Sequence, residues 1–247
     1  MVKLDLHYVD SRLVALYDFE NTRGADTDFY LSLAAELDAR RILDLGCGTG
    51  LLAREMVAPG RQIIGVDPSP AMLAFARQQP GAEQIQWIEG DASALGTPEA
   101  DLLVMTGNVA QIFLDDAEWL ATLTAIHTAL RPGGVLAFES RNPQDRGWER
   151  WNRAATFQRF DSPVGRMETW LELVSVGNGR VRFEGHNVFL ETGEVLVGSS
   201  ELRFRTLEEL TRSLTDSGFT VEHVYGDWNK GALLSTSRVM IFVARRN

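Results

Sequence analysis

The chain of 247 residues contains one cysteine, Cys47, so it can form neither an internal disulfide nor a metal site built from several cysteines. No apolar run reaches the roughly 20 residues that a membrane-spanning helix needs. The first residues, Met1 to Asp5, lack the apolar segment of a secretory signal peptide. The sequence therefore predicts a cytoplasmic protein with no membrane partner and no metal ion.

A basic excess is also missing, because the formal net charge is −10. The acidic excess lies wholly within residues 1–148, whereas acidic and basic side chains balance in residues 149–205 and again in 206–247. Proteins that bind nucleic acid usually carry a basic surface, and an acidic one repels phosphate. We therefore expect no nucleic-acid partner, although a local basic patch would not show in these sums.

The most informative stretch present runs from Arg41 to Leu52. The apolar run Ile42 to Leu45 is typical of a buried strand, and a helical pattern begins at Leu51. Three glycines at alternate positions separate them, which permits close approach of the backbone to a ligand. The helix start beyond offers free N–H groups to an anionic group. A tight strand-to-helix turn without any ligand would look similar, so the downstream chain has to decide.

The glycine spacing differs from the Gly-x-Gly-x-x-Gly of dinucleotide-binding folds. Asp44-x-Gly46-x-Gly48-x-Gly50 resembles instead the first motif of the class I S-adenosylmethionine (SAM)-dependent methyltransferases. In that family the motif binds the methionine moiety of the cofactor. The resemblance implies that Asp44, Gly46, Cys47 and Gly48 contact SAM. Cys47, between two of the glycines, is expected to point into the fold and not to act as a nucleophile.

The next strand, 62–67, ends in Asp67, where an acid can accept hydrogen bonds from ribose hydroxyls. Ser69 as N-cap and Pro70 at the first helical position predict a helix directly afterwards. An acid that merely stabilises the helix start is the alternative for Asp67. The family resemblance implies that Asp67 binds the ribose and that Pro68 and Met72 flank the adenine.

Two further segments match the family in the expected order. Strand 85–89 leads into Gly90-Asp91-Ala92, where the resemblance implies that Asp91 accepts from the adenine amino group, with Ala92 beside it. Strand 101–105 leads to Asn108, which is implied near the methionine amino group and the acceptor, or is a turn residue. The motif Asn/Asp-Pro-Pro-Tyr/Phe does not occur there, which argues against methylation of the exocyclic amino group of adenine or of glutamine. A Pro-Cys pair is also missing, which argues against methylation of cytosine C5. The run Leu130-Arg-Pro-Gly-Gly before strand 135–139 is also similar to the family.

Residues 1–40 precede the first strand, and helical periodicity predicts helices at about 8–18 and 26–38. Many small-molecule methyltransferases have such a segment, which closes over the cofactor. We expect residues 1–40 to form this lid with Tyr17 as its cofactor contact, whereas Tyr30 is expected in the core.

After Pro143 the alternation of strands and helices stops. Residues 167–176, 181–190 and 195–205 predict three antiparallel strands joined by Gly-containing turns. The predicted fold class is α/β: a Rossmann-like seven-stranded methyltransferase sheet from residues 41–147 and 206–247, with an inserted antiparallel three-stranded β subdomain at 148–205. This insert would cover the acceptor or form a dimer contact, so the chain is expected to be a monomer or a homodimer.

The resemblance implies transfer of a methyl group from SAM to an acceptor by in-line displacement, leaving S-adenosylhomocysteine (SAH), and the acidic body favours a small-molecule acceptor. An RNA or protein methyltransferase, or a SAM-binding module without activity, remains the alternative. Candidate catalytic residues are Glu139 and Arg141 at a strand end, and His186 in the insert. Equally, Glu139 and Arg141 would pair with each other or with nearby charges, and His186 would be structural.

Overall fold

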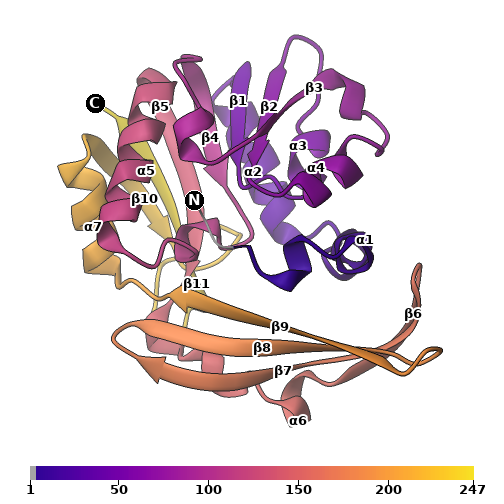
Figure 1. Cartoon of the computed structure of the whole chain (residues 1–247). Coiled ribbons are helices and arrows are strands. Elements are labelled where there is room, and N and C mark those ends of the chain that lie inside the picture. The colour runs from indigo at the N-terminus through magenta and orange to yellow at the C-terminus, as the bar shows by residue number, and fades with distance from the viewer. Residues whose placement is uncertain (1–3) are drawn as a thin grey trace.

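The computed structural model describes residues 4–247 as a seven-stranded sheet with helices on both faces and a separate antiparallel sheet (Figure 1). The larger sheet has the order β10-β11-β5-β4-β1-β2-β3. Only β11 runs antiparallel to both of its neighbours, and the predicted seven-stranded methyltransferase sheet is confirmed. The strands are β1 (Arg41–Leu45), β2 (Gln62–Asp67), β3 (Ile85–Glu89), β4 (Ala100–Met105), β5 (Leu130–Arg141), β10 (Phe219–Tyr225) and β11 (Val239–Arg246).

Helices cover both faces of this sheet. The α-helices are α1 (Ser11–Glu20), α2 (Ala25–Glu36), α3 (Leu51–Glu55), α4 (Pro70–Ala76), α5 (Asp116–Ala129), α6 (Arg153–Thr156) and α7 (Leu207–Asp216). One face packs against α2 and α3 through buried residues such as Phe29 and Leu52. The other packs against α5 and α7 through Trp119 and Leu210. None of the helices within residues 4–247 has the length and apolar character needed to cross a bilayer.

The helix starts follow the sequence signals. The Ser69 hydroxyl accepts the Met72 N–H at 3.1 Å, so α4 begins where its N-cap predicted. Thr206 and Glu209 form a reciprocal capping box at the start of α7. These caps fix the residues at which the two helices begin.

The inserted sheet has four strands, not the three that the sequence predicted. Its order is β6-β7-β8-β9, with bounds Gln158–Ser162, Gly165–Gly177, Arg180–Phe189 and Glu194–Arg203. The missed strand, β6, is short and polar, and Phe160 is its only hydrophobic side chain. It has too little apolar alternation to be recognised, because it lies at the sheet edge and buries almost nothing.

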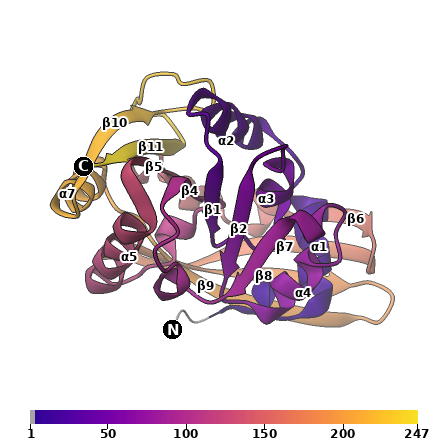
Figure 2. The same ribbon diagram turned by 90° about the horizontal axis from the view of Figure 1, so that it is seen from above.

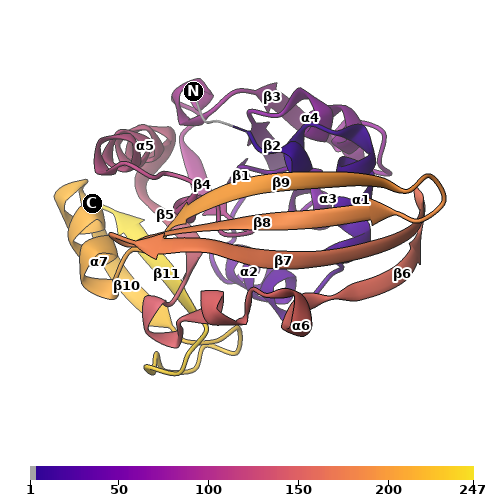
Figure 3. The same cartoon turned by 60° about the horizontal axis from the view of Figure 1, so that its bottom comes forward.

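The insert lies across the end of the core at which the parallel strands finish, with η1 (Leu6–Tyr8) and α1 between the two sheets (Figures 1, 2 and 3). Leu13 and Leu16 of α1 share a buried apolar cluster with Met167 of β7 and Phe189 of β8. The N-terminal segment, residues 4–20, is therefore packed between the core and the insert.

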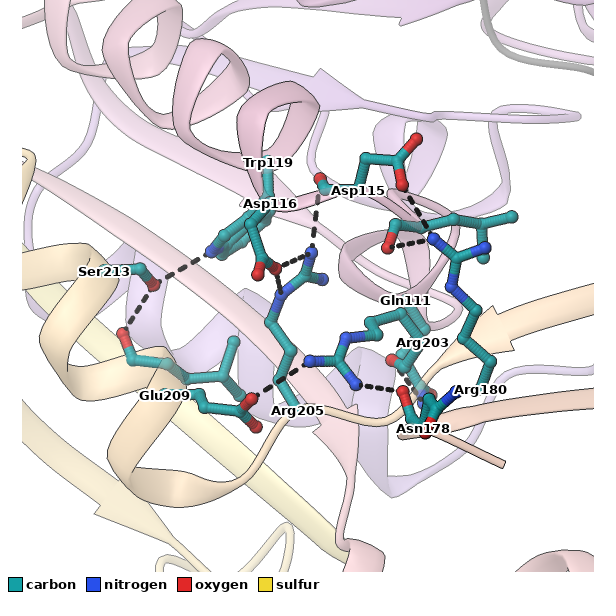
Figure 4. A network of polar contacts seen from close by, with 12 residues as sticks. Gln111, Asp115, Asp116, Trp119, Asn178, Arg180, Arg203, Arg205, Glu209 and Ser213 are labelled. Carbon is teal, nitrogen blue, oxygen red and sulfur yellow. Dashed lines mark hydrogen bonds and ion pairs between the residues drawn. The ribbon is translucent and has the colours of Figure 1, made fainter. Parts of the chain in front are cut away.

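A polar network fixes the other end of the insert to the core (Figure 4). Arg180 of β8 donates to the Leu114 carbonyl and to Asp115 at the start of α5. Arg203 of β9 donates to the Asn178 carbonyl at 2.8 Å and to Glu209 of α7 at 3.0 Å. The insert is thus held at both ends over the carboxyl edge of the core sheet.

Candidate active site

The glycine loop after β1 leaves open space at its middle position. Gly46, Gly48 and Gly50 have φ of 76°, 54° and 75°, which side chains with a Cβ adopt only with strain. A Cβ on Gly46 would lie 2.4 Å from Val109, whereas one on Gly48 would meet nothing within 4 Å. The loop is therefore packed against the turn after β4 at Gly46 and open to a ligand at Gly48.

Asp67 at the end of β2 connects this loop to the start of α4. Its two oxygens accept the N–H groups of Gly48 and Ser69, each at 2.8 Å. Burial raises the pKa of Asp67, while these two hydrogen bonds lower it. Each oxygen keeps a second lone pair, so binding of ribose hydroxyls remains the prediction for this residue. Pro68, directly after Asp67, is half-buried, and Met72 in α4 is buried.

Asp44, inside the end of β1, is a buried carboxylate without a partner. It is 1% exposed, and its Oδ1 has no hydrogen-bond partner within the described residues 4–247. Burial, together with the charges of Asp67 and Glu139, raises the pKa of Asp44 to about 7. A buried carboxylate of this kind is stabilised by a donor or a cation supplied from outside the chain.

Glu139, one of the catalytic candidates, already accepts two hydrogen bonds from within the chain and forms no ion pair within residues 4–247. It is buried, and its oxygens accept the Tyr30 hydroxyl and, at 2.7 Å, the Asn108 N–H. Burial raises its pKa, and these two hydrogen bonds oppose that effect. Glu139 therefore holds the turn after β4 against α2. Tyr30 lies in the core as expected.

Arg141 takes a different partner from either expected one. Its Nη1 and its backbone N–H donate to Gln111 Oε1 at 3.1 and 3.3 Å. It pairs with neither Glu139 nor any other carboxylate within residues 4–247. Gln111 was not identified from the sequence, because a lone glutamine in a loop carries no pattern; it is fully buried in η4 (Val109–Gln111).

His186 does not lie together with the other two catalytic candidates, Glu139 and Arg141. Gly185 and Asn187 of β8 face His7 of the N-terminal segment, so His186 between them faces the opposite side of the insert. It stacks on Trp170 at 4.6 Å and its Nε2 lies 3.1 Å from Glu172. The structure therefore does not bring His186 together with Glu139 and Arg141, and its role as a base is withdrawn.

The insert contains three tryptophans, Trp148, Trp151 and Trp170. Trp148 packs edge-on against Phe204 at 4.7 Å, and Trp170 lies on the outer face beside His186. Trp151 packs against Phe183 of β8 at 4.6 Å. Its other neighbour is Arg141, whose guanidinium lies 5.4 Å from the ring centre. Trp151 alone thus touches one of the candidate site residues.

The N-terminal segment closes against both loops. The Tyr17 hydroxyl lies 3.4 Å from where a Cβ of Gly107 would be, beyond the end of β4. Asp18 accepts from the Thr49 hydroxyl and from Arg54 at 2.7 Å. The Ser69 hydroxyl donates to the Tyr8 carbonyl. Tyr17 therefore lies close to the turn after β4, and its role as the cofactor contact of a lid stays a prediction.

The remaining candidates, Asp91, Asn108 and Cys47, lie in the loops that follow β3, β4 and β1. Asp91 accepts from the Ser93 N–H at 3.0 Å and from its hydroxyl, and Ala92 is buried beside it. Asn108 has a φ of 65° and presents its backbone N–H to Glu139. The Cys47 side chain is buried, and burial raises the pKa of its thiol, so it is poorly suited to act as a nucleophile.

The core matches a family model described as a methyltransferase domain, over residues 42–134. The chain is 25% identical over 244 residues to cypemycin N-terminal methyltransferase from a Streptomyces species, covering 96% of this chain and 97% of that enzyme. A SAM-dependent methyltransferase from Clostridium acetobutylicum superposes with a TM-score of 0.79 at 16% identity, over 96% of this chain and 97% of that one. SAM-bound CalS10, an amino pentose methyltransferase from Micromonospora echinaspora, gives 0.67 at 25% identity, over 91% and 92%. The matches to two further curated relatives span only 66% and 60% of their length.

Fold, glycine loop and strand-end acids define an α/β enzyme that binds a nucleoside cofactor. The chain is a SAM-dependent methyltransferase with the class I fold, and SAM is its methyl donor.

The site fits this cofactor. SAM carries an ammonium group, which is what the unpartnered Asp44 oxygen requires, and the space beside Gly48 admits a ligand close to the backbone. Asp67 would hold the ribose. When bound, SAM supplies an electrophilic methyl group on a sulfonium sulfur. The chain then has to align the acceptor with that methyl and exclude water.

Proposed function

We propose that the methyl acceptor is a small molecule bound at the carboxyl ends of β4 and β5, beneath the insert. The observation that carries this proposal is the packing of α1 between the two sheets, through Leu13 and Leu16 against Met167 and Phe189. A site covered from two sides favours a compact acceptor over a polymer. The balanced charge of residues 149–205 offers no basic surface to RNA.

Within this proposal, nitrogen is the acceptor atom we favour. The relative that matches nearly the whole chain, insert included, is named an N-terminal methyltransferase, and CalS10 is named an amino pentose methyltransferase. An amine is a nucleophile only after it loses its proton, so transfer to it should increase with pH up to the pKa of the acceptor.

An acceptor screen tests the proposal. Wild-type protein is incubated with SAM and small amines, alcohols and thiols, and in parallel with total RNA and with a protein mixture, while SAH formation is measured. Asp67→Ala serves as the control for turnover that depends on the cofactor site. We expect SAH with at least one small amine, and mass spectrometry should place the methyl group on nitrogen. Turnover confined to RNA or protein would refute the proposal, as would SAH binding without any turnover.

We further propose that the insert acts as the acceptor cover, and a pair of variants separates this role from a dimer contact. Phe183→Asp places a charge on the inner face, where Phe183 packs on Trp151. Val197→Asp changes the outer face, where Val197 is 44% exposed. The cover role predicts that only Phe183→Asp lowers turnover at an unchanged oligomeric state. If Val197→Asp instead converts a dimer to a monomer in light scattering and lowers turnover, the dimer contact is the correct role.

A further inference from the structure

Arg141 is a half-buried arginine at the candidate acceptor site that lacks a carboxylate partner. Its hydrogen bonds within residues 4–247 all go to the neutral side chain of Gln111. Arg205, between β9 and α7, differs from Arg141 in this respect. It is buried, and it pairs with Asp116 at 3.1 Å. Burying a cation without an anion is costly, so structures normally provide one.

The partners already present leave one edge of the Arg141 guanidinium unused. Gln111 occupies Nη1, whereas Nε and Nη2 donate to no protein atom within residues 4–247. Nε–H and Nη2–H point in parallel from this edge, and their spacing matches two oxygens of a carboxylate or phosphate. An ammonium in the same place would offer no such fork, which distinguishes arginine from lysine here.

Two neighbours hold the guanidinium plane in place. Gln111 is fully buried and donates from Nε2 to the Arg203 carbonyl at 3.4 Å, so its amide is fixed from the insert side (Figure 4). Trp151 lies under the guanidinium at 5.4 Å. The nearby carboxylate, Glu139, is already bound to Tyr30 and Asn108. The free edge is therefore oriented and is not neutralised by the chain itself.

We propose that the Nε–Nη2 edge of Arg141 binds an oxyanion of the acceptor, a carboxylate or a phosphate, and that Gln111 is the positioning residue that orients this edge. This inference rests on the proposed function, since it assigns the chemical class of the acceptor at the same site. The acceptor then carries an anionic group in addition to the atom that is methylated.

A binding experiment tests the inference without turnover. Protein saturated with SAH is titrated with benzoate, phenyl phosphate and inorganic phosphate, and with benzamide as the neutral match to benzoate. The arginine Nε–Hε signals are followed by NMR, and the Arg141 signal is the one lost in Arg141→Met. We expect a saturable shift with at least one oxyanion and none with benzamide. The oxyanion that binds distinguishes a carboxylate-bearing acceptor from a phosphate-bearing one.

Variants separate recognition from folding. Isothermal titration should show oxyanion affinity at least tenfold weaker in Arg141→Met, and weaker in Gln111→Met, with SAH affinity unchanged in both. Arg141→Lys should recover little, because it keeps the charge but not the fork. Arg153→Met is the matched control, since Arg153 stacks at 4.3 Å over Trp170 on the outer face and should bind as wild type. Absence of saturable oxyanion binding in wild type, or equal affinity in Arg141→Met, would overturn the inference.

The acceptor screen then distinguishes the two possible failures. Each acid or phosphate ester is assayed beside its amide or alcohol. One possible result is that wild type and Arg141→Met both methylate the amides as fast as the acids. That result would refute the oxyanion site but leave methyl transfer to a small molecule intact. No turnover of any small molecule, with oxyanion binding still lost in Arg141→Met, would instead refute the proposed function alone.

Discussion

Replacing Asp44 with asparagine should remove the pH dependence of SAM binding below neutral pH. In the free protein Asp44 is buried, its Oδ1 lacks a partner, and its pKa is about 7 instead of the usual 3.8. An ammonium group of the cofactor would pair with the ionised form only. Binding should therefore release a proton from Asp44 at pH values below 7.

The size of the effect follows from the shift. If pairing returns the pKa of Asp44 to near its ordinary value, affinity falls about tenfold for each pH unit below 7. Between pH 7 and pH 5 this amounts to about a hundredfold, or about 2.7 kcal/mol. At alkaline pH the amino group of the ligand itself loses its proton, so affinity should decline again.

Isothermal titration with SAH from pH 5 to 9, in buffers of different ionisation enthalpy, measures both affinity and proton release. SAH carries the same amino group and cannot be turned over. Wild type should lose affinity toward pH 5 and release close to one proton at pH 6. Asp44→Asn should bind more weakly at pH 7.5, with a flat profile on the acidic side. A wild-type profile that is equally flat would refute this account of Asp44.

The raised pKa of Asp44 also affects the stability of the protein without ligand. Because the folded state binds a proton at Asp44 that the unfolded chain has lost, the contribution of this residue to stability is greatest at low pH and decreases as pH rises from about 4 to 7. Asp44→Asn should therefore be more stable than wild type at pH 8 in urea unfolding without ligand. The expected pattern is a stability difference in favour of the variant that is small near pH 4, grows as the pH rises to about 7 and stays constant above that.

Three further changes test other parts of the site. Asp67→Ala should weaken SAM binding at least tenfold in isothermal titration, since it removes charge-assisted bonds worth about 1.5–3 kcal/mol; unchanged affinity would mean that the cofactor is held elsewhere. Cys47→Ala should retain transfer activity in the SAH assay, and a covalent acceptor adduct on Cys47 would contradict this. Tyr30→Phe removes the hydroxyl that Glu139 accepts and should lower the free energy of unfolding by about 1–3 kcal/mol, measured in urea, with SAH affinity nearly unchanged.

The core could be predicted from the sequence because its signals are local. Gly46, Gly48 and Gly50 follow a buried strand, and Asp67 ends the next one, so order and spacing alone place them at one sheet edge. Such features depend on backbone geometry within a few residues, which composition and periodicity reveal.

The partners of the catalytic candidates were not predictable in this way. Glu139 meets Tyr30 across 109 positions and Arg141 meets Gln111 across 30, and nothing in the local sequence of either indicates the other. His186 alternates correctly as a strand residue, but the face on which it lies depends on how the whole insert docks. Tertiary packing decides which side chains pair when they are far apart in the sequence. The periodicity of a single sequence does not reveal such pairs.

The docking of the N-terminal segment sets the order in which the protein can be completed during synthesis. The His7 ring occupies space left by Gly185 and Gly198, whose Cβ atoms would each lie 2.7 Å from it, and Arg12 pairs with Glu194 across 182 positions. These partners leave the ribosome long after the first helix does, so closure over the carboxyl edge is a late event and contacts this distant form slowly. We expect nascent chains ending before residue 180 to have a protease-sensitive segment 4–20, and chains released at full length to protect it. Early protection in the short chains would show that the segment folds onto the core without the insert.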